Sequence, residues 1–371
     1  MRNHIIIIGL LVSVFSNLSF AQNEVDVVRY LSTDFSGTAR VASMAGAFGS
    51  LGGDISTPLI NPSGSAIYLT SDVELTAGAS FYNSDVDIMN QKFSNGDGRV
   101  IFSNFGYVHS SNTKRSNSTY INFSMGYFRT KDFKFNSNSD IFNNKSSMLF
   151  DFTGQAQGIP VEELPNESPF YSNLAWDTYL IDEDTLGSSS YITQPRYEEY
   201  FSGVDQRNVV DENGSMGEMY FNSAIAIQQK IFIGVTLGFV AGTYSKKTSF
   251  TEQTTNDSLL LDYHVFVYEQ ESDINGINLK LGVIYKPQDW LRLGLAYHLP
   301  YKIHIVDNWF TTLRSQFKDG DFYSEKSPDG RIDYEIKNPG KLIFSAALIS
   351  GFRGLLSMDA EWIDYSKSKI I

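Results

Sequence analysis

The amino-acid sequence predicts an all-β protein, a transmembrane antiparallel β-barrel whose N-terminal segment lies inside the lumen. Three observations support this fold class. The chain begins with an export signal, nine later stretches alternate apolar with polar side chains, and the connections between those stretches alternate between long and short. Tyr and Phe are favoured in strands and at membrane interfaces, and aromatic residues make up 14% of the chain.

The first 21 residues have the pattern of a secretory signal peptide. Arg2 precedes an apolar run from Ile5 to Phe15, and small residues then lead to Ala21. The run is far shorter than the roughly 20 residues that a membrane-spanning helix needs, and no later segment offers a long uncharged apolar run. We therefore expect residues 1–21 to be removed and the mature chain to be exported.

The predicted strands are stretches in which apolar and polar side chains alternate. Residues 231–241 show the pattern, because every second side chain from Ile231 to Phe239 is large and apolar while the alternate positions include glycines and a threonine. Eight further stretches alternate in the same way: 73–81, 101–107, 121–127, 221–227, 277–285, 291–298, 342–348 and 356–362.

The connections between these strands decide between a barrel and a soluble β-sandwich. Long connections occupy residues 82–99, 130–217, 245–273 and 303–332, and short ones occupy residues 110–118, 229–230, 287–289 and 350–354. A sandwich has no reason to segregate loop lengths, whereas outer-membrane barrels have short periplasmic turns and long extracellular loops. We therefore expect a barrel in the bacterial outer membrane of a Gram-negative cell.

Charged side chains on the strands predict which face points inward. They are Lys280, Arg292, His298, Asp359 and Glu361. A charge at the membrane midplane costs about 2–4 kcal/mol, so these residues are expected to face the lumen. Taken one by one, each would also fit the solvated face of a soluble sheet, and the loop pattern favours the lumen.

The longest connection, residues 130–217, carries most of the negative charge. Residues 132–212 include 15 acidic and 4 basic side chains. We expect an extracellular loop that could serve as a docking surface for a protein partner. Its acidic run at 182–187 and the Asp319-Gly320-Asp321 sequence both fail the EF-hand pattern, so the sequence predicts no calcium site.

Composition excludes several classes of function. The absence of cysteine excludes disulfides, thiol catalysis and zinc-thiolate or iron–sulfur sites. A net charge of −13 and a pI of about 4.8 argue against nucleic-acid binding. The histidines at 109, 264, 298 and 304 lack metal-ligand spacing, and no catalytic constellation can be assigned. We expect no enzymatic activity, no metal and no cofactor.

A glycine-rich stretch precedes the first strand, at residues 44–64. It fails both the P-loop and the dinucleotide-binding patterns, because no Gly-Lys-Ser/Thr follows its glycines and their spacing is wrong. Val41, Met44 and Phe48 instead fall on one face of a short helix that would end at Gly52-Gly53. Small residues around them allow close packing, so the segment is expected to plug the lumen.

These residues resemble a known family. The sequence GTARVASMAGAFGSLGGDISTPLINPSGSA, residues 37–66, is similar to the N-terminal hatch of the FadL family of outer-membrane transporters for long-chain fatty acids and other hydrophobic compounds. The family motif ends in Asn-Pro-Ala-Gly or a close variant, and here it reads Asn61, Pro62, Ser63, Gly64. MDAEWIDYSKSKI, residues 358–370, resembles a family strand. The likeness covers residues 29–72 and 217–371.

The resemblance implies a function and roles for residues. It implies passive uptake of a hydrophobic molecule, which is captured outside, enters an apolar pocket in the lumen and is released laterally into membrane lipid after the hatch shifts. Asn61 and Pro62 would form the hatch turn, Val41, Met44 and Phe48 would pack the hatch, and Gly126 would be the strand kink. The fold is also used by a cargo-shuttling component of type IX secretion, which is the alternative function.

The resemblance also predicts the domain organisation. Residues 1–21 would be the signal peptide, residues 22–70 the hatch and residues 71–371 the barrel. The family barrel has fourteen strands, whereas this sequence offers about nine, and an odd number does not close in the usual antiparallel way. We expect the chain to be a family member truncated at its C-terminus, with an incomplete barrel.

Overall fold

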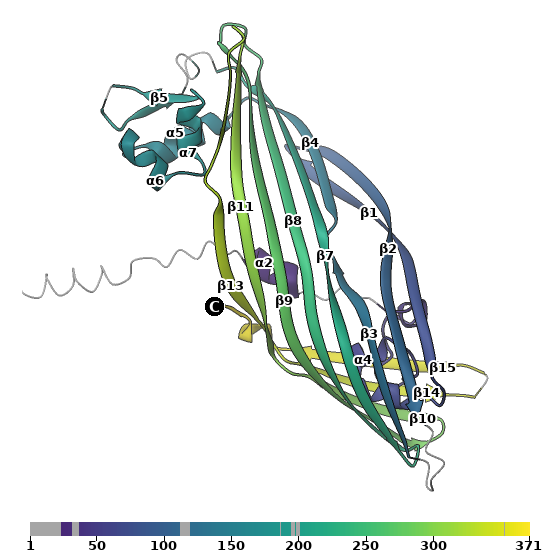
Figure 1. Ribbon diagram of the computed structural model, residues 1–371. Helices are drawn as coiled ribbons and strands as arrows, with labels where there is room; N and C mark the ends of the chain where they lie inside the picture. The colour runs from purple at the N-terminus through teal and green to yellow at the C-terminus, as the bar shows by residue number, and fades with distance from the viewer. Residues whose placement is uncertain are drawn as a thin grey trace, which may run out of the picture.

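The computed structural model describes residues 24–31, 37–111, 119–185, 187–193, 197, 201–351 and 353–371. The expected signal peptide, residues 1–21, lies outside the described residues. The protein is mostly β, with 62% strand against 14% helix, and its main body is one large, curled antiparallel sheet (Figure 1). In the described part of the chain, no helix is both long enough and apolar enough to cross a membrane.

Nine strands form the continuous path of the sheet, and each contains one of the nine predicted stretches. In spatial order they are β1 (Asp72–Ile88), β2 (Gln91–Ser111), β3 (Tyr120–Asp132), β7 (Val204–Ile227), β8 (Ile231–Thr254), β9 (Leu261–Gln288), β10 (Leu291–His298), β14 (Lys341–Ile349) and β15 (Leu355–Ile363). All neighbours are antiparallel. Within the described residues, β1 and β15 each pair with one neighbour, so the sheet is open along these two edges.

Three of the long connections are strand extensions rather than irregular loops, which corrects the sequence-based expectation. β1 and β2 continue to a tight turn at Met89–Asn90, and β8 and β9 remain paired far beyond the predicted stretches. The third connection forms β11 (Tyr301–Phe317), β12 (Phe322–Lys326) and β13 (Gly330–Asn338), and β11 pairs with the upper half of β9. Polar side chains on both faces hide the alternation in parts of these extensions, such as Glu269 to Ser272 of β9.

The fourth long connection is a folded unit. After β4 (Phe135–Asn143) it forms α5 (Met148–Ala156), η2 (Val161–Glu163), α6 (Leu164–Glu167), α7 (Ser172–Asp177), β5 (Ile181–Glu183) and β6 (Tyr191–Thr193). We call the described residues of 144–197 the cap. Leu149, Phe152 and Ala156 share one face of α5 and are fully buried, so an apolar core replaces the expected loop.

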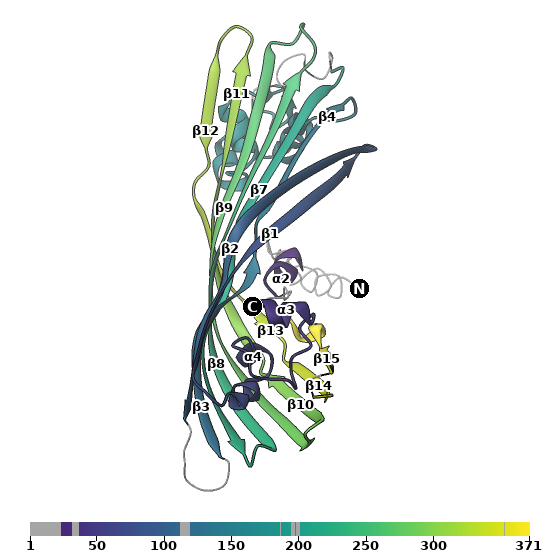
Figure 2. The same ribbon diagram turned by 90° about the vertical axis from the view of Figure 1, so that its right-hand side faces the viewer.

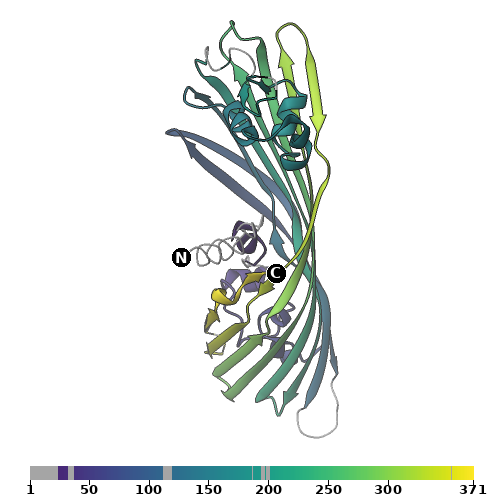
Figure 3. The same cartoon turned by 90° about the vertical axis from the view of Figure 1, so that its left-hand side faces the viewer.

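The cap packs on the concave face of the sheet. Phe152 and Tyr171 contact Phe266 of β9, with ring centroids 6.1 and 5.4 Å apart. The β8–β9 ladder has no register shift between Phe266 and Lys280, so even-numbered β9 residues all face this side. The cap therefore covers the end of the concave face that lies away from the short turns (Figure 3).

The N-terminal segment occupies the same face nearer the short turns (Figure 2). It consists of α2 (Glu24–Leu31), α3 (Ala39–Ser43), α4 (Thr57–Ile60) and η1 (Pro62–Ile67), and we call residues 37–67 the hatch body. Thr38 caps α3 by accepting a hydrogen bond from the Val41 N–H. The helix is shorter than expected, because the chain turns at Ala45 (φ 48°) and Gly46 (φ 80°). Near the end of the chain, η3 (Tyr365–Lys367) leads to β16 (Lys369–Ile370), which pairs with β13.

The two faces of the sheet differ in chemistry. The convex face carries exposed apolar side chains beside the short turns, which we call the apolar belt: Val73, Leu75, Phe105, Phe123, Met125, Met219, Phe221, Ile233, Val235, Leu237, Phe239, Ile277, Leu279, Leu281, Val283, Leu293, Leu295, Phe344, Leu348 and Met358. On β8 the alternation runs from Ile231 to Phe239, about 27 Å at the usual strand rise. The opposite face buries polar residues such as Asn222, Thr236 and Asn278 against the hatch body and one another.

Candidate functional site

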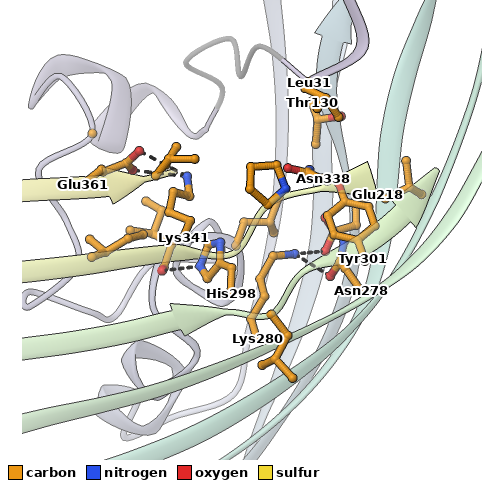
Figure 4. A pocket seen from close by; sticks show the side chains of 18 of the residues that line it. Leu31, Thr130, Glu218, Asn278, Lys280, His298, Tyr301, Asn338, Lys341 and Glu361 are labelled. Atoms are coloured by element: carbon orange, nitrogen blue, oxygen red, sulfur yellow. Dashed lines mark hydrogen bonds and ion pairs between the residues drawn. The ribbon is translucent and has the colours of Figure 1, made fainter. Parts of the chain in front are cut away.

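A cavity of about 490 Å³ lies between the N-terminal segment and the concave face of the sheet (Figure 4). This volume is in the range of small-molecule sites. The N-terminal segment supplies Tyr30, Leu31, Leu59 and Ile60, and Ala45, Gly46 and Ala47 complete its side. The sheet supplies lining residues from β7, β8 and β9 and, across the curl, from β10, β14 and β15. The cavity is therefore enclosed by the N-terminal segment on one side and the curled sheet on the other.

The lining is part apolar and part charged. Leu31, Leu59, Ile60, Met216, Val240 and Ile343 are apolar, whereas Glu218, Asn278, Lys280, His298, Lys341 and Glu361 are polar or charged. A mixed wall of this kind fits an amphipathic molecule, because the apolar side chains contact a hydrocarbon part and the polar groups orient a head group. Among the described residues, no group of three or more His, Asp or Glu side chains is placed to hold a metal ion.

Lys280 belongs to a buried polar cluster at the wall of the cavity. Its Nζ donates to Glu218 Oε1 and, at 2.9 Å, to Asn278 Oδ1, while Asn278 Nδ2 donates to Glu218 Oε2 at 3.0 Å. Glu218 reaches from β7 across β8, and a Cβ at Gly238 would lie only 2.1 Å from its Oε1. Because Lys280 and Glu218 are about 6% and 5% exposed, each charge depends on the other for compensation.

Two further polar groups lie near this cluster. His298 Nε2 is 3.0 Å from the carbonyl oxygen of Ile60, and because a carbonyl only accepts, this nitrogen carries the proton. Lys341 Nζ is 3.3 Å from both carboxylate oxygens of Glu361, whose side chain is 46% exposed. Because its partner Glu361 is half exposed, Lys341 is the cation of the cavity whose ion pair a ligand carboxylate could replace most easily.

The Asn-Pro turn of the hatch body is seated on glycines of the sheet. Asn61 Nδ2 donates to Gly49 O at 2.7 Å, and Asn61 Oδ1 accepts from Ser63 N and Oγ at 3.2 and 2.6 Å. A Cβ at Gly282 would lie 2.0 Å from Asn61 Oδ1, and one at Gly234 would lie 2.3 Å from the carbonyl oxygen of Pro62. These neighbouring glycines, paired across β8 and β9, therefore form the seat.

The remaining predicted charges fix the hatch body to the last strands. Arg292 donates to the carbonyl oxygen of Leu51, and Asp359 accepts from the Gly49 N–H at 2.8 Å. Asp359 also lines the cavity, whereas Arg292 is not among the lining residues. All five residues named from the sequence thus lie on the concave face, and three of them, Arg292, His298 and Asp359, form hydrogen bonds with hatch backbone.

The predicted packing residues of the hatch form a small core. Val41 and Phe48 are 0% and 1% exposed and cluster with Leu51 and with Ala347 of β14, and Met44 packs against them partly exposed. Val41, Met44 and Phe48 therefore lie together, at the spacing on which the prediction rested. They hold the hatch body against β14 and do not line the cavity.

Gly126, the predicted strand kink, lies where the pairing of β3 with both neighbours is regular. It pairs regularly with Gly106 and Tyr220, and the register shift of β3 falls later, between Arg129 and Lys131. Its small size serves packing instead, since a Cβ there would lie 2.4 Å from the carbonyl oxygen of Phe105 and 2.9 Å from the Tyr220 ring.

Comparison with known proteins gives no relative: no protein-family model, no curated protein and no solved structure matches the chain.

The glycine seat can be tested by adding a side chain. Gly282→Val should push the Asn61–Pro62 turn away and raise the hydrogen-exchange rate of residues 61–67 about tenfold to a hundredfold, since overpacking costs about 1–3 kcal/mol. The matched control is Gly78→Val, because a Cβ at Gly78 meets its nearest atom at 3.5 Å. Unchanged exchange in Gly282→Val would show that the hatch body does not depend on this contact.

The buried Lys280–Glu218 pair makes a second prediction. Lys280→Met leaves the Glu218 carboxylate uncompensated and should lower the free energy of unfolding by about 3–5 kcal/mol, whereas adding Glu218→Leu should recover most of it. Lys341→Met, which breaks the half-exposed pair with Glu361, should cost at most about 1 kcal/mol. Denaturant titration in detergent measures all of these, and a double variant as unstable as the single one would contradict the pairing.

Proposed function

We propose that this protein is an outer-membrane transport protein for the passive uptake of hydrophobic molecules, with long-chain fatty acids as the expected class. The observation that carries the proposal is the cavity between hatch body and sheet, whose lining combines apolar side chains with the cations Lys280 and Lys341. A hydrocarbon chain and an acidic head group require these two kinds of surface together.

The apolar belt supports a membrane location. On β8 the belt runs from Ile231 to Phe239, which agrees with the roughly 9–11 residues that a tilted strand needs to cross the membrane core. The belt lies beside the short turns, as in barrels whose short turns face the periplasm. In this orientation the concave face is the lumen of a FadL-like barrel, and the extended hairpins and the cap stand on the extracellular side.

The contacts of the hatch body suggest the sequence of events. A ligand that enters from the extracellular end reaches the cavity first, where its carboxylate can replace Glu361 as the partner of Lys341. Beyond the cavity its path is closed by the Asn61–Pro62 turn on its glycine seat. Passage into the membrane therefore requires the hatch body to shift and to exchange these hydrogen bonds for others.

The membrane orientation predicts where a charge is harmful. Val235→Arg places a charge in the middle of the belt and should reduce the stability of the protein folded in lipid vesicles by about 2–4 kcal/mol. Thr243→Arg, on the same face of β8 but beyond the belt, should cost much less. Equal effects of the two substitutions would contradict a lipid-facing belt.

The ligand class can be tested by comparing two head groups. The purified protein should bind a fluorescent long-chain fatty acid, and Lys341→Met should weaken that binding about tenfold, the equivalent of about 1.4 kcal/mol for one lost charge-assisted contact. Binding of the matching fatty alcohol should be unchanged. If neither compound binds, the uptake function is wrong. If Lys341→Met weakens the binding of both compounds equally, Lys341 does not recognise the carboxylate head group.

A protein partner remains the second candidate function. The cap carries Glu162, Glu163, Glu167 and Asp177, none of which forms an ion pair with another described residue. Unpaired carboxylates suit a basic partner and a shuttle role like that in type IX secretion. A protein that co-purifies with the full chain and is lost when residues 144–201 are deleted would favour this candidate.

A further inference from the structure

The contact between the cap and the sheet contains a buried acid–base pair that the proposed uptake does not use. His264 of β9 is 0% exposed and lies edge-on to Phe152 of α5, with ring centroids 6.4 Å apart. Its Nε2 is 3.6 Å from Glu252 Oε2 on β8. Among the described residues, neither ring nitrogen of His264 has a hydrogen-bond partner.

Glu252 fastens the cap to the sheet. Its carboxylate, 1% exposed, accepts hydrogen bonds from Ser147 Oγ at 2.5 Å and Met148 N at 2.8 Å, at the start of α5. It also accepts one from Gln206 Nε2 of β7 at 2.7 Å. Any change in charge at this position therefore acts directly on the docking of the cap.

Among the described residues, the other titratable groups that face the pair are Asp151 on α5, Tyr171 before α7 and Tyr197, whose hydroxyl donates to Ser147 Oγ at 3.1 Å. On β11 the residue opposite His264 is Ser315, whose Oγ donates to the carbonyl oxygen of Thr178 at 2.7 Å.

Burial sets the direction of the response to pH. It lowers the pKa of His264 to about 3, against an ordinary value near 6.5. Once the cap leaves, the ring regains water and its ordinary pKa, so below about pH 6.5 the released state binds a proton that the docked state does not. Docking is therefore weakened as the pH falls.

Glu252 opposes part of this effect. Burial raises the pKa of its carboxyl group, so the docked state gains a proton there more readily than the released state. That gain favours docking on acidification. The histidine alone would shift the docking equilibrium about thirtyfold between pH 7.5 and 5.0, and the net shift in the protein should be smaller.

We propose that the cap is an acid-releasable cover, which leaves the concave face when His264 is protonated. At neutral pH it covers the extracellular end of that face, and in acid it uncovers the approach to the cavity. Its role in ligand access rests on the proposed uptake function. The release itself does not, because it involves the cap and the sheet alone.

The chain has no cysteine, so a single introduced thiol can report release. Ser315→Cys places it on the sheet under the cap, at a position that is 0% exposed, and Lys247→Cys provides an exposed reference on β8. Each variant is labelled with a disulfide-exchange reagent that remains reactive in acid. The quantity measured is the labelling rate of Ser315→Cys divided by that of Lys247→Cys. This ratio should rise severalfold, and at most about thirtyfold, from pH 7.5 to 5.0.

Variants identify the group that responds. Added to the cysteine variants, His264→Phe should give the same ratio at both pH values. A low ratio at pH 7.5 shows that the cap is still docked in this variant. If Phe fits poorly and the ratio is already high, His264→Gln replaces it and should also give a ratio that does not change with pH. His304→Gln, a histidine of β11 outside the cap contact, should keep the full rise. A flat ratio in the parent, or a rise that persists without His264, would overturn the proposal. No ligand is present, so a protein that transports nothing would still give a valid answer.

Discussion

Close packing between the backbone of the hatch body and glycines of the sheet fixes the hatch body and, with it, one wall of the cavity. Gly234 and Gly282 receive the Asn61–Pro62 turn, and Gly294 lies against the carbonyl group of Gly49. With the turn held there, Ile60 comes within reach of His298 and forms part of the cavity wall. A larger side chain at any of these glycines would move the wall of the cavity together with the hatch.

The same contact gives buried polar side chains of the sheet additional hydrogen-bond partners. Asn222 Nδ2 donates to the carbonyl oxygen of Pro62 at 3.1 Å, and Thr236 Oγ1 donates to that of Pro58 at 3.0 Å. Buried polar groups without partners are costly, so a concave face rich in Asn, Ser and Thr needs either this segment or water. Movement of the hatch body is therefore feasible only where water can take over these hydrogen bonds.

The strands and their order could be predicted because one face of each is apolar over several residues, and period-two alternation then shows directly in the sequence. The extensions escaped detection because, for example, Glu269 to Ser272 of β9 are polar on both faces. The fold of the cap is hard to predict although Leu149, Phe152 and Ala156 show helical spacing, because its helices are short and charged residues surround them. Glu218 could not be assigned to Lys280, because their meeting depends on the register of three strands and on the space above Gly238.

The unbroken ladder between β8 and β9 also fixes distances along the sheet. It runs from Ile231 to Gln253 without a register shift, so the separation between the cap contact at His264 and the cavity at Asn278 is set by the strand rise, at about 46 Å. That span is longer than an ordinary fatty acid, so one ligand cannot contact His264 and Asn278 at once. Any effect of His264 on a head group bound at Asn278 and Lys280 therefore has to pass through the protein.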